Sequence, residues 1–296
     1  MYDVIVLGSG PAGLTAALYA ARAKKKTLVL GGDSFGGQLN VIHSLENYPG
    51  FLGTGPELGK FMKKQAIDAG AELEMEEASK ISVVDSGFSV AAKSGKKYLA
   101  RTVIIATGAK PRKIEVKGAK EFLGRGVSYC ATCDGFFYSD KNVIVVGGGN
   151  SALSDALYMA NIAKTVKIVY RKSSFARAEQ VLVDRAKEKP NISVMWNTEL
   201  AEVGGTEEGV AFVVTTAGEK ILCDGVFVAI GHEANTDYLN ESIVRDNVGR
   251  LVPVALPAGM YVAGDVRSGI KMQVATAVGW GCECAMDAVA FLNAGK

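Results

Sequence analysis

The sequence predicts an α/β fold in which one strand–turn–helix unit occurs twice. Residues 4–14 (VIVLGSGPAGL) match residues 143–153 (VIVVGGGNSAL), and Ala17-Leu18-Tyr19 matches Ala156-Leu157-Tyr158 at the same offset. Each copy opens with a short, wholly apolar run, which is typical of a strand buried on both faces. A second apolar run follows each predicted helix, at 27–30 and 166–170. The resulting order of strand, helix and strand is that of a parallel α/β sheet.

The composition is that of a globular protein with more than one domain. The chain has 296 residues, 48% hydrophobic and 22% charged, and this length favours two domains. A net charge of +2 without a basic stripe argues against nucleic-acid binding. The N-terminus enters a strand pattern at once, and the apolar runs are shorter than the roughly 20 residues of a bilayer span. We therefore expect a cytoplasmic protein without nucleic-acid or membrane contacts.

The first copy carries the spacing Gly8-x-Gly10-x-x-Gly13 between its strand and its helix. Such glycines allow a tight turn, a close approach of backbone to a pyrophosphate, and close packing of helix on sheet. The helix N-terminus then offers N–H groups to the phosphates. The acid that usually ends the second strand is missing, so either Asp33 or a backbone group is expected to hold the ribose.

The second copy carries Gly147-x-Gly149-x-x-Ala152, a second dinucleotide fingerprint. Its second strand ends in Tyr170-Arg171-Lys172, with cations where an acid would select a free 2′-hydroxyl. This favours NADPH over NADH, and Arg177 is expected to add a contact to the 2′-phosphate. The alternative is a solvated basic loop that binds nothing.

The remaining segments complete two Rossmann-like three-layer nucleotide-binding domains, the second inserted in the first. The last sixty residues have no fingerprint of their own, so the simplest topology returns them to the first domain. We expect a discontinuous domain of residues 1–110 and 234–296, and an inserted domain of residues 111–233. Further strands are predicted within 80–100, 101–106, 209–216, 225–230 and 261–265, and a closing helix over 273–292.

A Cys-x-x-Cys pair stands just before the second fingerprint, in Cys130-Ala131-Thr132-Cys133-Asp134-Gly135. Two thiols at this spacing can close a small disulfide, and a turn or helix start lowers the pKa of one of them. Asp134 is placed to act as a general acid when the disulfide opens. The alternative for Asp134 is a helix cap or turn residue before Gly135.

No metal site is predicted, because zinc would need a second Cys/His pair. Cys223, Cys282 and Cys284 are expected to be structural, and His43 and His232 to be hydrogen-bonding residues of loops. Two nucleotide fingerprints around a dithiol indicate a flavoprotein that carries electrons from a nicotinamide to a disulfide.

The order of these motifs resembles the low-molecular-weight thioredoxin reductases over essentially the full chain, and CATCDG is the most specific mark. Further matching motifs are Gly36-Gly37-Gln38-Leu39, Glu46-Asn47-Tyr48-Pro49-Gly50, Ala106-Thr107-Gly108, residues 231–236 and Gly264-Asp265. The resemblance implies a homodimer with FAD in the discontinuous domain and NADPH in the inserted one. It also implies two alternating domain orientations.

By the same resemblance, Cys133 takes electrons from the flavin, Cys130 attacks the disulfide of thioredoxin, and Asp134 donates the proton. The FAD contacts it implies are Gly8, Gly10, Pro11, Ala12, Gly13, Gly37, Gln38, Asn47, Asp265 and Gln273. The NADPH contacts predicted from the second fingerprint and the resemblance are Gly147, Gly149, Asn150, Ser151, Arg171, Lys172 and Arg177.

The chain departs from the family pattern at three places. The family's His-Arg-Arg phosphate motif reads Tyr170-Arg171-Lys172, and the arginine that follows is displaced by one position to Arg177. The arginine expected before Gln273 is Met272. These changes bear on the nicotinamide preference, so NADH or another donor stays open. Two other readings also stay open: a flavin-dependent dithiol oxidase of a small molecule, and a reductase of another thioredoxin-like protein.

Overall fold

The computed structural model describes residues 1–42, 44–240, 243–254 and 256–295, and His43 therefore lies outside the described part. The chain forms two compact units. Unit 1 comprises Met1–Lys110 and Glu233–Lys296, and unit 2 comprises Pro111–His232. The two connecting segments, β9 (Ala109–Pro111) and β18 (His232–Ala234), pair as a small sheet of their own.

Unit 1 is built on a seven-stranded sheet in the order β5-β2-β1-β8-β7-β6, with β19 also paired to β8. Strands β1, β2, β5, β8 and β19 run parallel, and β6–β7–β8 form an antiparallel meander. Its strands and helices are β1 (Tyr2–Leu7), α1 (Pro11–Arg22), β2 (Thr27–Leu30), η1 (Gly37–Val41), β3 (Leu45–Tyr48), β4 (Phe51–Gly53), α2 (Gly55–Asp68), β5 (Glu72–Glu74), β6 (Ala78–Val84), β7 (Gly87–Ala92), β8 (Lys97–Ile105), β19 (Met260–Val262), η3 (Gly264–Val266) and α6 (Val274–Asn293).

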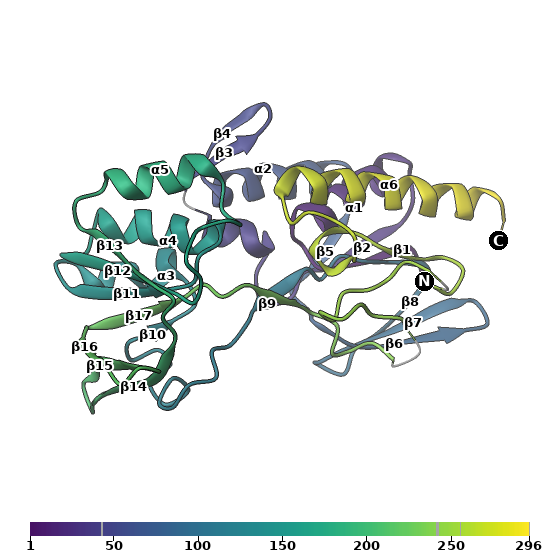
Figure 1. Cartoon of the computed structure of the whole chain (residues 1–296). Helices are drawn as coiled ribbons and strands as arrows, with labels where there is room; N and C mark the ends of the chain where they lie inside the picture. The colour runs from purple at the N-terminus through teal and green to yellow at the C-terminus, as the bar shows by residue number, and fades with distance from the viewer. Residues whose placement is uncertain (43, 241–242, 255, 296) are drawn as a thin grey trace. The chain divides into compact units, whose positions relative to one another are not determined.

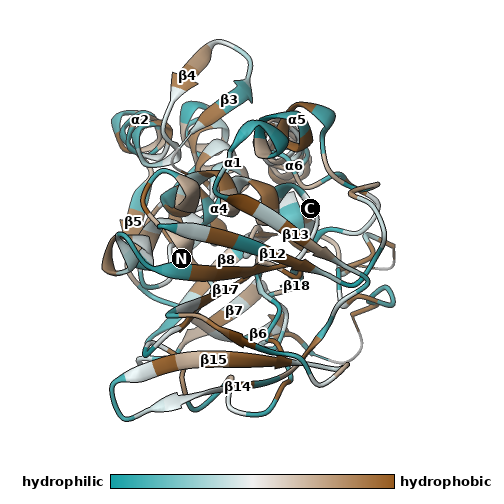
Figure 2. Cartoon of the chain, turned by 60° about the vertical axis from the view of Figure 1, so that its left-hand side comes forward, coloured by the Kyte–Doolittle hydropathy of each residue, from teal (hydrophilic) through white to brown (hydrophobic). Residues whose placement is uncertain are grey.

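Unit 2 repeats the plan with a five-stranded parallel sheet in the order β10-β17-β11-β12-β13, beside a three-stranded antiparallel sheet β14-β15-β16. Figure 2 shows β15 hydrophobic along most of its length, which fits its central place in the smaller sheet. The elements are β10 (Val127–Ser128), α3 (Ala131–Asp134), η2 (Gly135–Tyr138), β11 (Asn142–Val146), α4 (Asn150–Ala160), β12 (Thr165–Tyr170), α5 (Gln180–Glu188), β13 (Ile192–Trp196), β14 (Leu200–Thr206), β15 (Gly209–Thr215), β16 (Lys220–Leu222) and β17 (Gly225–Val228).

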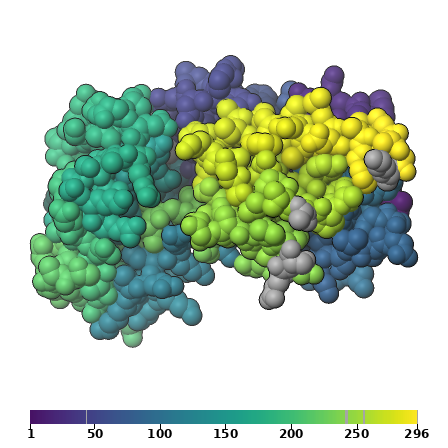
Figure 3. All heavy atoms as spheres, turned by 45° about the vertical axis from the view of Figure 1, so that its right-hand side comes forward, coloured from purple at the N-terminus to yellow at the C-terminus, as the bar shows by residue number. Residues whose placement is uncertain are grey.

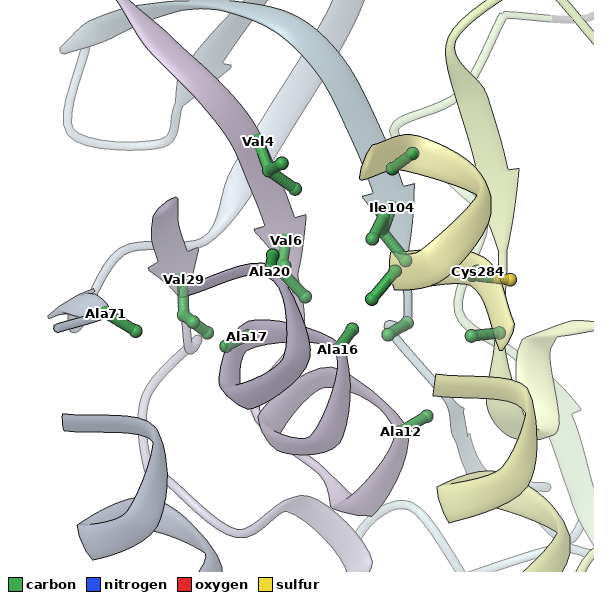
Figure 4. Packing of buried hydrophobic residues seen from close by; sticks show 14 of the residues in the cluster. Val4, Val6, Ala12, Ala16, Ala17, Ala20, Val29, Ala71, Ile104 and Cys284 are labelled. Atoms are coloured by element: carbon green, nitrogen blue, oxygen red, sulfur yellow. The ribbon is translucent and has the colours of Figure 1, made fainter. Parts of the chain in front are cut away.

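Helices α1, α2 and α6 cover one face of the sheet in unit 1 (Figure 1). The core beneath them is rich in alanine, and Figure 4 shows Ala16 and Ala20 of α1 toward Val6 of β1, and Ala12 toward α6. Such small side chains let α1 lie close on the sheet. Helix α6 also approaches closely, because a Cβ added at Gly281 would meet the carbonyl oxygen of Ala12. The close packing fixes the start of α1, where the first fingerprint lies.

Helix α6 corrects one expectation from the sequence. In the described part of the chain it is the one helix that is long and apolar enough to cross a bilayer, judged by its 20 residues and its composition alone. One face of α6 is nonetheless buried in unit 1, through Ala277, Gly281, Ala285, Ala288 and Leu292. Figure 3 shows the other face at the surface of the unit. The helix therefore serves as an outer layer of the α/β core.

Candidate active site

The cysteine pair lies at the start of the short helix α3. Cys130 and Cys133 form a disulfide, with their Cα atoms 5.3 Å apart. Cys130 occupies the N-cap position, where its Sγ accepts the backbone N–H of Cys133 at 3.1 Å. Cys130 is half-buried and Cys133 is exposed. When the disulfide is reduced, an N–H group directed at Cys130 Sγ stabilises a thiolate there.

Ser128 connects the cysteine pair to Asp134, and sequence reasoning missed it. Its hydroxyl donates to Asp134 Oδ2 at 2.6 Å, and its Oγ accepts the backbone N–H of Cys130 at 3.0 Å. Ser128 is buried, whereas Asp134 is half-buried. The single hydroxyl therefore fixes both the acid and the first cysteine. The available signal was a hydroxyl residue two positions before the cysteine, at the end of a strand.

Two exposed aromatic rings follow the cysteine pair on η2. Phe136 and Phe137 are 78% and 69% exposed, and their rings meet edge to face at 6.2 Å. Large apolar side chains this exposed beside a disulfide mark a surface suited to contact with another macromolecule. The next residue, Tyr138, instead packs on Phe227 of β17 and holds η2 on the sheet of unit 2.

The three glycines of the first fingerprint have two roles: two pack closely against backbone, and one leaves the backbone accessible. A Cβ at Gly8 would meet the carbonyl oxygen of Ala106, and one at Gly13 would meet that of Gly8. Gly8 also has a φ of +99°, which disfavours any other residue. A Cβ at Gly10 would meet nothing within 4 Å. The backbone at Gly10 is therefore open to the close approach of a ligand, at the N-terminus of α1.

The second fingerprint repeats this division. A Cβ at Gly147 would meet the carbonyl oxygen of Ala229, whereas one at Gly149 would meet nothing within 4 Å. Ala152 is fully buried at the third position. The loop starts α4 as the first fingerprint starts α1, so each unit presents an open backbone at a helix N-terminus.

Four of the residues expected to hold FAD meet in two pairs within unit 1. Gln38 Nε2 donates to Asp265 Oδ2 at 3.1 Å, and Asn47 Nδ2 donates to Gln273 Oε1 at 3.1 Å. The other carboxylate oxygen, Asp265 Oδ1, is buried without a hydrogen-bond partner. Burial raises the pKa of Asp265, while the charge of Arg250 and the hydrogen bond from Gln38 oppose that rise. A buried acceptor without a donor fits a ligand hydroxyl, such as those of the ribityl chain.

The start of the first loop holds a further residue that sequence reasoning missed. Ser9, between the first two glycines, is buried and donates to the carbonyl oxygens of Gly31 and Ser34 at 2.9 and 3.3 Å. It fastens the fingerprint to the segment after β2. Asp33, one of the two predicted ribose holders, is exposed in that same segment.

The basic residues of unit 2 lie beyond the end of β12. Arg171, Lys172 and Arg177 are exposed, and no ion pair joins them to an acid in the described part of the chain. The Tyr170 ring packs against Gly148 and is stacked on Phe175, 5.7 Å away. Tyr170 is therefore a packing residue, and the cations after it are free to meet a phosphate.

Asn150 has a partner that the sequence did not reveal. Its amide exchanges two hydrogen bonds with Glu179, from Nδ2 to the carboxylate at 2.8 Å and from the Glu179 N–H to Oδ1 at 2.7 Å. The pair ties the start of α4 to the segment that carries Arg177.

Among the expectations for the remaining cysteines and the second histidine, the one for the histidine is wrong. Cys223, Cys282 and Cys284 are free, and burial raises the pKa of Cys223 to about 12 and of Cys284 to about 11. Cys223 and Cys284 are therefore poor nucleophiles, in keeping with the structural role expected of them. His232 was expected in a loop, but it begins β18, because the connecting segments pair there. Burial lowers its pKa.

Comparison with known proteins decides the family. A family model described as pyridine nucleotide-disulphide oxidoreductase matches residues 2–281. A thioredoxin reductase of Rickettsia felis is 40% identical over 304 aligned positions, covering 98% of each chain. A bifunctional thioredoxin reductase/thioredoxin of Mycobacterium leprae is 41% identical over 99% of this chain and 66% of its own. This chain belongs to the thioredoxin reductases of the pyridine nucleotide-disulphide oxidoreductase family.

Solved structures of this family agree. The thioredoxin reductase of Lactococcus lactis is 33% identical, with a TM-score of 0.95 over 99% of this chain and all of that one. That of T. acidophilum is 34% identical, with a TM-score of 0.91 over 98% of each chain. The predicted fold class is thereby confirmed. A ferredoxin-flavin thioredoxin reductase of Clostridium acetobutylicum is also similar, at 30% identity and a TM-score of 0.53 over 99% of this chain and 98% of that one.

Proposed function

We propose that this chain is a thioredoxin-disulfide reductase that uses FAD and NADPH. The observation that carries the proposal is the Cys130–Cys133 disulfide at a helix start in a unit with its own dinucleotide fingerprint. The overall change is two electrons and a proton from NADPH, plus one proton from solvent, to one disulfide of thioredoxin, which becomes two thiols. FAD, when bound, supplies the two-electron step between nicotinamide and sulfur.

Unit 1 is the proposed FAD domain. The open backbone at Gly10 and the N-terminus of α1, with Pro11 and Ala12, would receive the pyrophosphate. Asp265 Oδ1, the buried acceptor without a partner, would take a ribityl hydroxyl. The remaining proposed contacts are Gly8, Gly13, Gly37, Gln38, Asn47 and Gln273.

Unit 2 is the proposed NADPH domain. The open backbone at Gly149 and the start of α4, with Gly147, Asn150 and Ser151, would receive the pyrophosphate. Arg171, Lys172 and Arg177 supply three positive charges for the 2′-phosphate and no carboxylate for a free 2′-hydroxyl. Lysine gives a point charge where arginine gives a bidentate fork, so we expect a moderate rather than absolute preference for NADPH over NADH.

The two cysteines and Asp134 would carry out the exchange. With the pair reduced, Cys130 as thiolate attacks one sulfur of the partner's disulfide, and a mixed disulfide forms as the partner's second sulfur leaves. Cys133 then attacks Cys130, which restores the Cys130–Cys133 disulfide and releases the second partner thiolate. Asp134, fixed by Ser128, is the proposed proton donor to a leaving sulfur.

Exposed surfaces support the proposed partners. Phe136 and Phe137 beside the disulfide offer thioredoxin an apolar contact. For a homodimer, unit 1 presents an apolar groove of about 330 Å³ between α1 and α2, with the 60%-exposed Phe61 at its side. An apolar groove lined by an exposed aromatic ring suits burial against the same face of a second copy. We propose the cytoplasm as the location, where thiols are kept reduced.

An anaerobic titration of the purified protein tests the proposal. We expect NADPH to bleach the flavin absorbance at lower concentrations than NADH, and added oxidised thioredoxin to restore it. Cys130→Ser should keep the bleaching by NADPH and lose the reoxidation by thioredoxin. A protein that binds no flavin, or a Cys130→Ser variant that reduces thioredoxin at the normal rate, would contradict the proposal. Bleaching by reduced ferredoxin alone would replace the nicotinamide with another donor.

A further inference from the structure

Asp265 is an incompletely satisfied acid beside the first fingerprint. It lies on η3, where a Cβ at Gly264 would stand 2.8 Å from Cβ of Ala12. Only one of its oxygens has a partner, Gln38 on η1. A carboxylate in this place loses hydration and lies near a site proposed for phosphates, so a nearby cation is needed to keep it charged.

Arg250 is the cation on the segment next to η3, because the N–H of Leu251, the residue after Arg250, donates to the carbonyl oxygen of Val266, the residue after Asp265, at 2.8 Å. Its Nη2 contacts Met272 Sδ at 3.2 Å, one residue before Gln273, and its charge lowers the pKa of Asp265. No ion pair within 4.0 Å joins Arg250 to an acid among the described residues. Arg250 is therefore a half-buried residue whose guanidinium lies against a thioether rather than in an ion pair.

A tight turn fixes the backbone of Arg250. Its N–H donates to Asp246 Oδ1 at 2.9 Å, and its carbonyl oxygen accepts the N–H of Asp246 at 2.8 Å. Asp246 Oδ1 also accepts the N–H of Val248 at 3.0 Å. The Asp246 carboxylate thus binds backbone N–H groups, and the Arg250 guanidinium contacts Met272 instead.

The other arginine nearby faces a different group. Arg267 lies two residues after Asp265, and its guanidinium sits 3.7 Å over the Trp280 ring on α6. Its charge acts on the buried Cys284 thiol. Among the described residues, the charge that lowers the pKa of Asp265 is therefore that of Arg250, and the amide of Gln38 supplies its hydrogen bond.

We propose that Arg250 is a positioning residue for FAD, whose positive charge stabilises the Asp265 carboxylate as the acceptor of a ribityl hydroxyl. The inference rests on the proposed FAD site in unit 1. Position 272 carries a methionine where the family pattern has arginine, and Arg250 Nη2 lies against that methionine. A single guanidinium, carried by residue 250 or by residue 272, should be enough to stabilise the Asp265 carboxylate.

FAD binding to the stripped apoprotein, followed by quenching of flavin fluorescence, tests this without an activity assay. We expect Arg250→Met to raise the Kd for FAD about tenfold at pH 8 and further at pH 6, since a charge-assisted interaction is lost. Arg250→Lys should restore most of the affinity. Arg250→Met combined with Met272→Arg should also recover part of it. Arg22→Met, which removes an exposed charge at the far end of α1, is the matched control and should bind FAD normally.

A double-mutant cycle tests whether Arg250 acts on FAD binding through Asp265 or through its positive charge alone. Asp265→Asn should weaken FAD binding by itself, and Arg250→Met should then add little in the Asp265→Asn background. Thermal unfolding of each apoprotein identifies variants that bind poorly because they are misfolded. Normal affinity of folded Arg250→Met at both pH values, or the same tenfold loss in the Asp265→Asn background, would overturn the inference. A wild-type apoprotein that takes up no FAD would instead overturn the proposed function.

Discussion

The two fingerprints have the same strand–turn–helix plan, but small and large residues occupy different positions in and around the two loops. At the third position, Gly13 lies so close to Gly8 that a Cβ would meet its carbonyl oxygen, whereas unit 2 accommodates Ala152. Between the first two glycines of the loop, unit 1 has Ser9, which contacts the small Gly31 after β2. At the equivalent position unit 2 has Gly148, which packs against the large ring of Tyr170 at the end of β12. Each loop is thus packed tightly by a different pairing of small and large residues. Glycine is needed where backbone meets backbone, and the repeat alone does not tell which positions those are.

The largest contrast is expected at the third position. Gly13→Ala should destabilise the apoprotein by about 3 kcal/mol and abolish FAD retention, because its Cβ meets backbone that cannot move aside. The reciprocal change Ala152→Gly should cost only about 1 kcal/mol, the helix propensity difference. Chemical denaturation of both variants and their flavin content check the pair. Equal losses in the two would show that the loops are packed alike.

Substitution of the middle glycine of either fingerprint should weaken nucleotide binding without destabilising the fold. A Cβ at Gly10 or Gly149 meets no protein atom within 4 Å, so Gly10→Ala and Gly149→Ala should unfold at nearly the wild-type temperature. Each should weaken its own nucleotide at least tenfold, because backbone can no longer approach the pyrophosphate. Gly10→Ala should lose FAD, and Gly149→Ala should keep FAD while its KM for NADPH rises. Loss of FAD from Gly149→Ala would mean that the two loops do not serve separate cofactors.

The charges at the second strand ends provide the next contrast, since unit 2 has cations there and unit 1 has none. Arg171→Gln should raise the KM for NADPH about tenfold and leave that for NADH nearly unchanged, because only the former has a 2′-phosphate. Lys187→Gln, which removes an exposed charge from α5, is the control. Equal KM changes for both nucleotides would place Arg171 outside the 2′-phosphate site.

The smallest expected effect concerns Asp155 of α4, which stands where α1 has the buried Ala16. Burial raises the pKa of Asp155 to about 7. Because this folded-state pKa exceeds the unfolded value near 4, the folded protein binds the proton more tightly, and stability falls as pH rises from about 4 to 7. Asp155 is only half-buried, so solvent screens much of this effect, and Asp155→Asn should stabilise the protein by about 1 kcal/mol at pH 8 and by little at pH 4. Denaturation at the two pH values measures this, and a gain at pH 4 alone would contradict it.

The residues that sequence reasoning found and those it missed differ in the range of their contacts. The repeat, the fingerprints and the Cys130-x-x-Cys133 pair are visible in the sequence because their chemistry depends on spacing within one segment. Ser128 and Glu179 were missed because their roles arise from hydrogen bonds to Asp134 and Asn150 that the folded loops create. His232 was expected in a loop, because a three-residue strand that pairs with a distant segment is too short to show an alternating pattern of polar and apolar residues.

The sequence by itself determined the α/β order, the two helix starts that can face phosphate, and the dithiol, since local backbone geometry and residue chemistry dictate them. Only the tertiary structure decided which glycines are sterically required, because that depends on which carbonyl oxygen lies opposite. It also decided that Asp265 keeps one buried oxygen without a partner and that the segment carrying Arg250 pairs with the segment carrying Asp265. Burial and long-range charge are properties of packing between distant segments, and no local pattern encodes them.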